Sequence, residues 1–261
     1  MDIQQLKSLK ILVIGEACVD RYHVGSCERL SPEFPVPVFK KKESFDKPGM
    51  ASNVLSGFLN VGINAEIISQ SECCLKERFI DEKTGYHLLR VDSFDEVKEL
   101  SLKELELLDL NYYSCLVISD YGKGFLSESA AVYLRENFKG PIFVDTKKTD
   151  LSCFSNCIVK INELEKNSLI KQNTEAKLIT TLGSRGAEYR GEIYNPSFQR
   201  SVFDVCGAGD TFLTAFVIGY MIYGDIRASI PLANYCAGIA VESRGTYKIT
   251  LKDLEEYKDA I

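Results

Sequence analysis

The residues best suited to chemistry lie in one stretch, Asp204 to Thr211, which directly precedes a long apolar run from Phe212 to Tyr223. If that run is a helix, the segment 207–209 presents unpaired backbone N–H groups at its amino end, where the helix dipole favours an anion. Asp210 would stand beside that anion as a base. A base next to a phosphate cradle is the minimum equipment for moving a phosphoryl group onto an alcohol.

A structural interpretation of the same stretch remains open at this point. Asp204 could cap the helix, the two glycines could form a tight turn, and Asp210 could simply complement the helix dipole. Short motifs of this kind also arise by chance.

The composition narrows the class of protein. The chain has 261 residues, of which 45% are hydrophobic and 26% charged, enough for one large α/β domain with a sizeable core. The net charge of −6 argues against a general binder of nucleic acid or of anionic membranes. No apolar run reaches transmembrane length and no signal peptide is visible, so we expect a cytoplasmic protein.

Cysteine and histidine usage points away from disulfides and metal clusters. The nine cysteines are odd in number, several lie in apolar runs, and none forms a CxxC pair, so we expect reduced thiols. With only two histidines, a His-based metal cluster or catalytic triad is poorly supplied.

Apolar runs of strand length recur along the chain, and each is followed by polar residues and then by a helical pattern. The runs cover residues 11–15, 65–69, 115–119, 141–144, 157–161 and 178–181. Continuous apolar runs are typical of buried parallel strands, and ligands bind at the carboxyl ends of such strands. We therefore predict a three-layer α/β/α fold with a mostly parallel sheet, whose polar clusters gather along one edge.

Two polar residues are candidates for binding hydroxyl groups, namely Asp20 and Asn53. Each has a purely structural alternative, since Asp20 could be a turn residue and Asn53 a helix cap. Asp95 to Leu108 has the pattern of an acidic amphipathic helix.

Two segments predict a small β lid on a single domain that covers residues 1–261. Arg29 to Phe39 holds three prolines, which exclude a helix and suit an extended arm. Glu82 to Gly85 separates two strand-like runs as a hairpin turn, and Arg78 lies in the first run at a position that a surface strand could tolerate. The lid is expected over about residues 20–42 and 76–92.

Two motifs resemble the ribokinase-like (PfkB) carbohydrate kinases. The stretch Asp204 to Thr211 is similar to that family's D-x-x-G-A-G-D signature, and Asn162 to Glu165 is similar to its N-x-x-E motif. Within the family, the resemblance is greatest to D-glycero-β-D-manno-heptose 7-phosphate kinases. It is carried chiefly by Arg29 to Val38, which reads RLSPEFPVPV, and further by residues 20–22, 90–92 and 119–124.

The resemblance implies a ribokinase-like fold and the ATP-dependent, Mg²⁺-assisted phosphorylation of a sugar hydroxyl, here the anomeric hydroxyl of a heptose 7-phosphate. It implies a catalytic group made of Asp210, Gly207, Ala208 and Gly209. It places the nucleotide against Asn162, Glu165, Thr181, Gly183, Gly186 and Asn234, with Glu165 reaching Mg²⁺ through water. It places the sugar phosphate against Asp20, Arg29, Gly49, Asn53, Lys76, Arg78 and Asp120. A homodimer formed through the lid is also expected.

The chain departs from the family pattern at several points. Met50 stands where the family has glycine, and Cys206 stands where the heptose kinases commonly have threonine. Segments near 70–75 and 166–174 are shortened, so we expect a sheet edge and a helix to be trimmed. Two alternatives stay open: a kinase for another sugar or a nucleoside, and a catalytically silent paralogue that serves as a binding module. No nucleotidyltransferase domain follows in the sequence, so a separate enzyme is expected to complete ADP-heptose synthesis.

Overall fold

A sheet of eight strands forms the centre of the body in the computed structural model, which describes residues 6–72, 74–93, 97–171, 175–196, 201–243 and 245–259. The strand order is β12-β11-β10-β9-β8-β7-β1-β4. The six strands from β4 to β10 in that order are parallel, and β11 and β12 continue the sheet in antiparallel pairs. The strands are β1 (Lys10–Gly15), β4 (Asn64–Ile68), β7 (Cys115–Asp120), β8 (Ile142–Thr146), β9 (Ile158–Asn162), β10 (Lys177–Thr181), β11 (Ala187–Tyr189) and β12 (Glu192–Tyr194).

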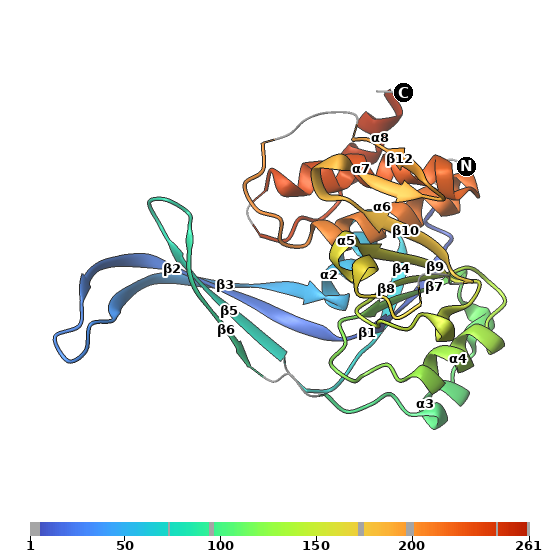
Figure 1. Ribbon diagram of the computed structural model, residues 1–261, viewed down its shortest axis with the longest axis horizontal. Coiled ribbons are helices and arrows are strands. Elements are labelled where there is room, and N and C mark those ends of the chain that lie inside the picture. Colours follow the sequence, from blue (N-terminus) through green and yellow to red (C-terminus); the bar gives the residue numbers. More distant parts are fainter. Residues whose placement is uncertain are drawn as a thin grey trace.

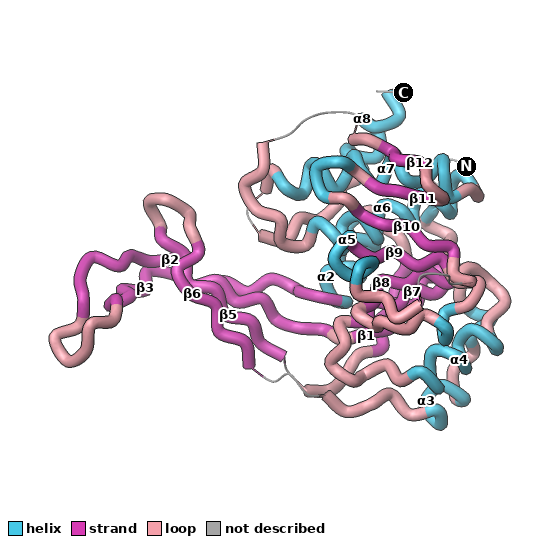
Figure 2. Tube along the Cα trace, in the orientation of Figure 1, coloured by secondary structure: helices cyan, strands magenta, loops and turns pink. Residues whose placement is uncertain are grey.

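Helices cover both faces of this sheet (Figures 1 and 2). One face packs against α2 (Ala51–Asn60), α6 (Ala208–Tyr223), α7 (Ile226–Val241) and α8 (Leu251–Asp259). The other face packs against α3 (Leu102–Glu106) and α4 (Glu128–Asn137). The continuous apolar sequence of β1 follows from burial on both faces of the sheet. Ile11 and Val13 pack into the core on the α6 side, and Leu12 and Ile14 pack into the core on the α4 side. The predicted three-layer arrangement is therefore present.

The predicted acidic helix is much shorter than expected. Helix α3 begins only after Ser101, whose side chain closes a capping box with Glu104. Just before it, the backbone N–H of Leu100 bonds to the carbonyl of Phe125, which holds this part of the chain against its neighbour instead of in a helix. Residues 94–96 of the predicted helix lie outside the described residues.

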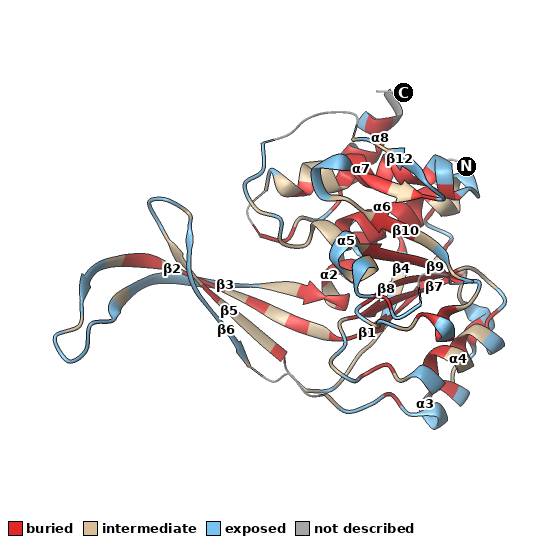
Figure 3. Cartoon of the chain, in the orientation of Figure 1, coloured by how far each residue is buried: buried red, intermediate tan, exposed pale blue. Residues whose placement is uncertain are grey.

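The lid is a second sheet of four strands in the order β3-β2-β5-β6. Its strands are β2 (Ala17–Leu30), β3 (Pro37–Met50), β5 (Cys74–Asp81) and β6 (His87–Ser93). The sheet projects away from the body, and its outer part is largely exposed (Figure 3). The proline-rich stretch forms the turn between β2 and β3, and residues 82–85 form the turn between β5 and β6.

The connection from β4 to the lid is short, as its sequence predicts. Gln70 in this connection is bonded to the start of β2, because its side-chain amide forms two hydrogen bonds with the backbone of Ala17, at 2.9 Å and 2.5 Å. Strand β4 is thus the edge of the large sheet, and β2 and β5 enter the lid as parallel neighbours. Among the described residues, none of the helices combines the length and apolar character needed to cross a membrane.

Candidate active site

The amino end of α6 is open toward the carboxyl edge of the large sheet. Gly207 is the residue before the helix and has a φ of 76°, in the left-handed region, with no side chain capping the first turn. A Cβ there would lie 3.0 Å from the Nδ2 atom of Asn53, so both conformation and space require glycine. The possibility that Asp204 caps this helix is wrong: its carboxylate instead accepts the N–H groups of Cys206 and Gly245, each at 2.9 Å.

Asp210 lies in the first turn of α6, buried beneath this amino end. One carboxylate oxygen accepts a hydrogen bond from the Nδ2 atom of Asn53 at 2.9 Å, and the other accepts one from the hydroxyl of Tyr121 at 2.7 Å. Burial raises the pKa of Asp210 to about 6, although both hydrogen bonds and the charge of Lys160 oppose the increase. A carboxylate with this pKa is suited to act as a general base near neutral pH.

Tyr121 lies against Asp210, and the motifs did not single it out. It follows β7, and the fully buried Glu16 holds its loop by accepting the backbone N–H groups of Tyr121, Lys123 and Phe125 at 2.7, 3.0 and 3.3 Å. Burial and the charge of Asp210 raise the pKa of Tyr121 well above its ordinary value, so its hydroxyl stays protonated and donates to Asp210. In the sequence, the only pointer to this loop was Glu16, the carboxylate residue directly after the first strand.

A buried ion pair lies close to Asp210 and was also missed. Lys160 on β9 and Asp145 on β8 are both buried, and the Nζ and Oδ2 atoms are 2.7 Å apart. Burial lowers the pKa of Lys160, but the charges of Asp145 and Asp210 outweigh it and the pKa is raised. A Cβ at Gly209 would lie 3.0 Å from Nζ of Lys160, so this ammonium group sits directly against the first turn of α6.

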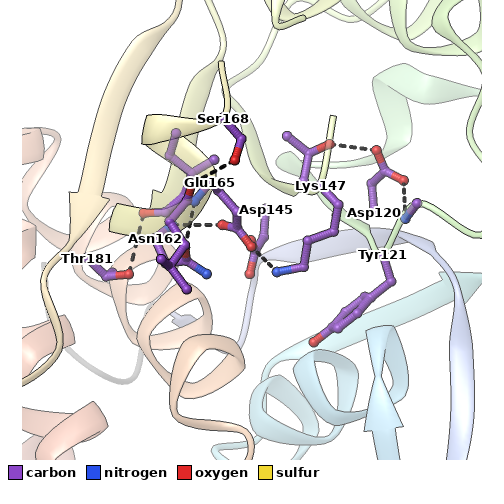
Figure 4. Close-up of polar contacts among 12 residues, drawn as sticks. Asp120, Tyr121, Asp145, Lys147, Asn162, Glu165, Ser168 and Thr181 are labelled. Carbon is purple, nitrogen blue, oxygen red and sulfur yellow. Dashed lines mark hydrogen bonds and ion pairs between the residues drawn. The ribbon is translucent and has the colours of Figure 1, made fainter. Parts of the chain in front are cut away.

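The predicted nucleotide residues Asn162 and Glu165 form a capping box at the start of α5 (Glu163–Asn167). The N–H of Glu165 bonds to Oδ1 of Asn162 at 2.9 Å, and the N–H of Asn162 bonds to Oε2 of Glu165 at 2.7 Å. The second oxygen of Glu165 pairs with Lys147. Figure 4 shows Lys147 and Tyr121 on the same side of the site as Asp120, opposite Asn162 and Thr181. The N-x-x-E motif therefore has a structural role in capping α5, and its binding role stays a prediction.

The other predicted nucleotide residues form a neighbouring group. Thr181 ends β10 in register with Asn162 of β9. Gly183 follows in a single turn, η3 (Gly183–Arg185), where a Cβ would meet open space. Asn234 of α7 donates a hydrogen bond to the carbonyl of Tyr194 at 2.7 Å, and its Nδ2 atom lies 3.0 Å from the Cβ position of Gly186. The structure thus brings Gly186 and Asn234 together.

Arg78 lies inside the lid and not on its surface. Its side chain is buried and forms an ion pair with the buried carboxylate of Asp20. The guanidinium also contacts Sγ of Cys206 at 3.5 Å. Because a Cβ at Gly49 would collide with the Asp20 carboxylate, Gly49 lets β3 pack closely on this pair. Arg78 therefore fixes Asp20 where β2 enters the lid, and its charge is already neutralised.

The remaining predicted sugar residues differ in position. Asp120 is buried, and its carboxylate accepts the Thr146 hydroxyl at 2.6 Å and the Gly122 N–H at 3.0 Å. Lys76 is partly exposed, with its ammonium group 5.4 Å from the ring centre of Tyr121. Arg29 is exposed near the far end of β2, nine residues beyond Asp20 and roughly 30 Å along the strand, so one chain does not bring it to the site.

The site fits a magnesium ion held mainly by phosphate and water. The described residues hold no group of three or more His, Cys, Asp or Glu side chains arranged to bind a metal ion. Oδ1 of Asp145 is nevertheless buried without a hydrogen-bond partner among those residues, and Glu165 lies across from it. Mg²⁺ commonly uses only one or two carboxylates and keeps several waters, so this donor set suffices.

Residues 127–253 match the family model described as "pfkB family carbohydrate kinase". The "Bifunctional protein HldE" of Nitratiruptor sp. is 29% identical over 305 residues, covering 97% of this chain and 65% of that protein. The chain spans less than two thirds of the length of such relatives.

Solved structures share the fold. Phosphofructokinase-2 from Escherichia coli in complex with potassium has a TM-score of 0.74 at 14% identity, covering 97% of this chain and 99% of that one. Arabidopsis thaliana ribokinase, complexed with ribose and ATP, has a TM-score of 0.67 at 14% identity and covers 95% and 98% of the two chains. The chain therefore shares the fold of these kinases, and its residues 127–253 are similar to the pfkB family of carbohydrate kinases.

Proposed function

We propose that the chain transfers the γ-phosphoryl group of ATP to a hydroxyl of a sugar phosphate, and that the acceptor is the anomeric hydroxyl of D-glycero-D-manno-heptose 7-phosphate. The observation that carries the phosphoryl-transfer part is the position of Asp210, a buried carboxylate with a pKa of about 6 in the first turn of an uncapped helix. The acceptor rests on the R-x-S-P-E-x-P-V-P-V sequence and on the HldE relatives.

In this mechanism Asp210 orients the acceptor hydroxyl and takes its proton. Tyr121 and Asn53 hold the two carboxylate oxygens, so the base keeps one orientation. The backbone N–H groups of the first turn of α6 stabilise the charge on the phosphoryl group as it moves. Lys160 lies directly beneath Gly209 and is paired with Asp145, so this ion pair forms part of the polar surroundings of the same helix end. Such a site works by positioning and electrostatics, as a loose transition state requires.

ATP and Mg²⁺ are the proposed cofactors. The nucleotide would lie against the loop from Thr181 to Gly186 and beside Asn234. The Arabidopsis ribokinase, which has the same fold, is described as complexed with ribose and ATP. Glu165 and Asp145 would hold the ion through its waters, and Mg²⁺ would neutralise charge on the β- and γ-phosphates. Lys147, paired with Glu165 at the mouth of the site, would lie near the same phosphates.

For the sugar phosphate we propose Asp20, Asn53 and Lys76 as direct contacts. A phosphate dianion needs a fixed cation, and Lys76 is partly exposed next to Tyr121, whereas Arg78 is already paired. Asp120 would act indirectly, because its carboxylate holds Thr146 and the loop that carries Tyr121.

Turnover with a panel of acceptors tests the proposal. ADP release would be measured with heptose 7-phosphate, with other sugar phosphates, and with neutral sugars and nucleosides, for the natural chain and for Asp210→Asn. We expect turnover with heptose 7-phosphate that is lost in Asp210→Asn. Turnover with another acceptor alone would overturn the heptose assignment, and ATP binding without turnover on every acceptor would overturn the kinase assignment for this chain.

We also propose that two copies associate through the lid. Strands β3 and β6 are the edges of the lid sheet, and β6 exposes Leu88, Leu89 and Val91 at 46%, 57% and 39%. Association along such an edge would bury these side chains. Light scattering of the natural chain and of Leu89→Lys tests this: we expect a dimer for the first and a monomer for the second, and a monomer for both would reject it.

A further inference from the structure

A second polar cavity lies at the edge of the large sheet opposite the active site. It has a volume of about 380 Å³ and is lined where β8, β9 and β10 begin, by Ile142, Ile158 and Lys177. Tyr220, from the last turns of α6, lines it as well. Asp145 and Lys160 lie three and two residues further along β8 and β9, so the cavity lies at the other end of these strands from the proposed catalytic site.

The cavity is basic although the chain is acidic. Arg135, Lys139 and Lys177 line it, and no Asp or Glu does, in a protein whose net charge is −6. Among the described residues, neither Lys139 nor Lys177 forms an ion pair, and the guanidinium of Arg135 contacts only the exposed Glu136 among carboxylates, at 2.9 Å. Two of the three cations are therefore available to an incoming anion.

Two of the three cations act on one group that lines the cavity. That group is Cys157, and burial raises the pKa of its thiol to about 11. The positive charges of Arg135 and Lys177 both oppose that increase, so their electrostatic fields overlap at one point. Helix α4 ends at Asn137 beside the cavity, and its carbonyl end repels anions, but Arg135 lies in its last turn and offsets this.

The other walls of the cavity are apolar and could pack against a ring of a bound ligand. Phe138 and Tyr220 contribute aromatic side chains, and Ile142 and Ile158 contribute aliphatic ones. Gly140 lies against the Phe138 ring, since a Cβ there would come within 2.5 Å of that ring, and this close packing shapes the wall. A pocket that joins cations to apolar walls is typical of sites for small organic anions.

We propose that this cavity binds a small phosphate monoester with an attached ring, either a sugar phosphate or a nucleoside monophosphate, as an effector site distinct from the active site. Arg135, Lys139 and Lys177 would hold the phosphate, and Phe138 and Tyr220 would pack against the ring.

Residue-resolved NMR of the natural chain tests this with three probes: inorganic phosphate, glucose 6-phosphate and AMP. The amides of Gly140, Asn156 and Lys177 report on the cavity, and those of Gly207 and Gly209 report on the active site. We expect saturable shifts at the cavity amides with one of the two ring-bearing phosphates, and weaker binding of inorganic phosphate alone. The comparison of glucose 6-phosphate with AMP decides which ring the cavity accepts.

Lys177→Glu provides the decisive variant, with Lys252→Glu on exposed α8 as the matched control. We expect Lys177→Glu to weaken binding at the cavity amides about tenfold or more, with no change at Gly207 and Gly209 and no loss of basal turnover. Lys252→Glu should bind as the natural chain does. Absence of cavity shifts at about 10 mM of all three probes, or equal affinity of the two variants, would overturn the proposal.

Discussion

The hydroxyl of Tyr121 donates a hydrogen bond to Oδ1 of Asp210 across 2.7 Å, and so joins the loop after β7 to the first turn of α6. The two residues are far apart in the sequence, and the loop that carries Tyr121 is held in turn by the buried carboxylate of Glu16. The state of the proposed base therefore depends on a residue outside the family signature.

Replacing Tyr121 by Phe should move the acidic limb of the pH–rate profile. The hydrogen bond from Tyr121 lowers the pKa of Asp210, so its loss should raise that pKa from about 6 by about one unit, given the usual strength of a hydrogen bond to a charged group. The measurement is kcat/KM between pH 5 and pH 9. Tyr113→Phe is the control, because Tyr113 makes a bond of the same 2.7 Å length to Glu66 at the surface. An unmoved limb in Tyr121→Phe would contradict the assignment of Asp210 as the base.

Asp210→Asn should change how stability depends on pH. The pKa of Asp210 in the folded chain is raised above its ordinary value of 3.8, so its stabilising contribution is full below that value and is lost as pH rises through about 6. Relative to Asp210→Asn, the natural chain should lose on the order of 2–3 kcal/mol of unfolding free energy between pH 4 and pH 7. Urea unfolding of both proteins across this range measures it. If the unfolding free energies of the two proteins changed in parallel with pH, burial would not raise the pKa of Asp210.

Arg78→Met should destabilise the fold, because it leaves the Asp20 carboxylate buried and unpaired. The expected loss is roughly 3–5 kcal/mol of unfolding free energy. Adding Asp20→Asn to Arg78→Met should recover most of it. The control is Arg21→Ala, which breaks an exposed pair with Asp46 and should cost about 0–1 kcal/mol. If Arg78→Met kept full stability but lost affinity for a sugar phosphate, the structural role given to Arg78 would be rejected in favour of substrate binding.

Lys76→Ala should raise KM for the phosphorylated acceptor about tenfold or more while kcat changes little, because a charge-assisted contact to the substrate phosphate is lost. Lys76→Arg should restore much of the affinity. Lys42→Ala, which removes an exposed lid lysine paired with Glu82, serves as the control for net charge. Steady-state kinetics with varied sugar phosphate at saturating ATP give both constants, and a fall in kcat with constant KM would argue for a role in the chemical step instead.

The sequence by itself determined the elements and the main motifs. Continuous apolar runs such as the one in β1 report burial on both faces of a sheet, and that requirement is local to each strand. Glycine at position 207 likewise reports a backbone conformation that its own residue must adopt. The order of the polar clusters after the strands was enough to predict that they share one edge of the sheet, where the proposed base Asp210 lies.

Only the tertiary structure decided which charges meet. Arg78 and Asp20 lie 58 positions apart, and Lys160 and Asp145 lie on different strands, so their pairing depends on strand register and not on local pattern. The same holds for Tyr121, whose hydroxyl reaches Asp210 only because Glu16 fixes its loop. Whether a charged residue is available to substrate depends on the partners that the fold brings to it, since a buried ion is stable only when it is paired.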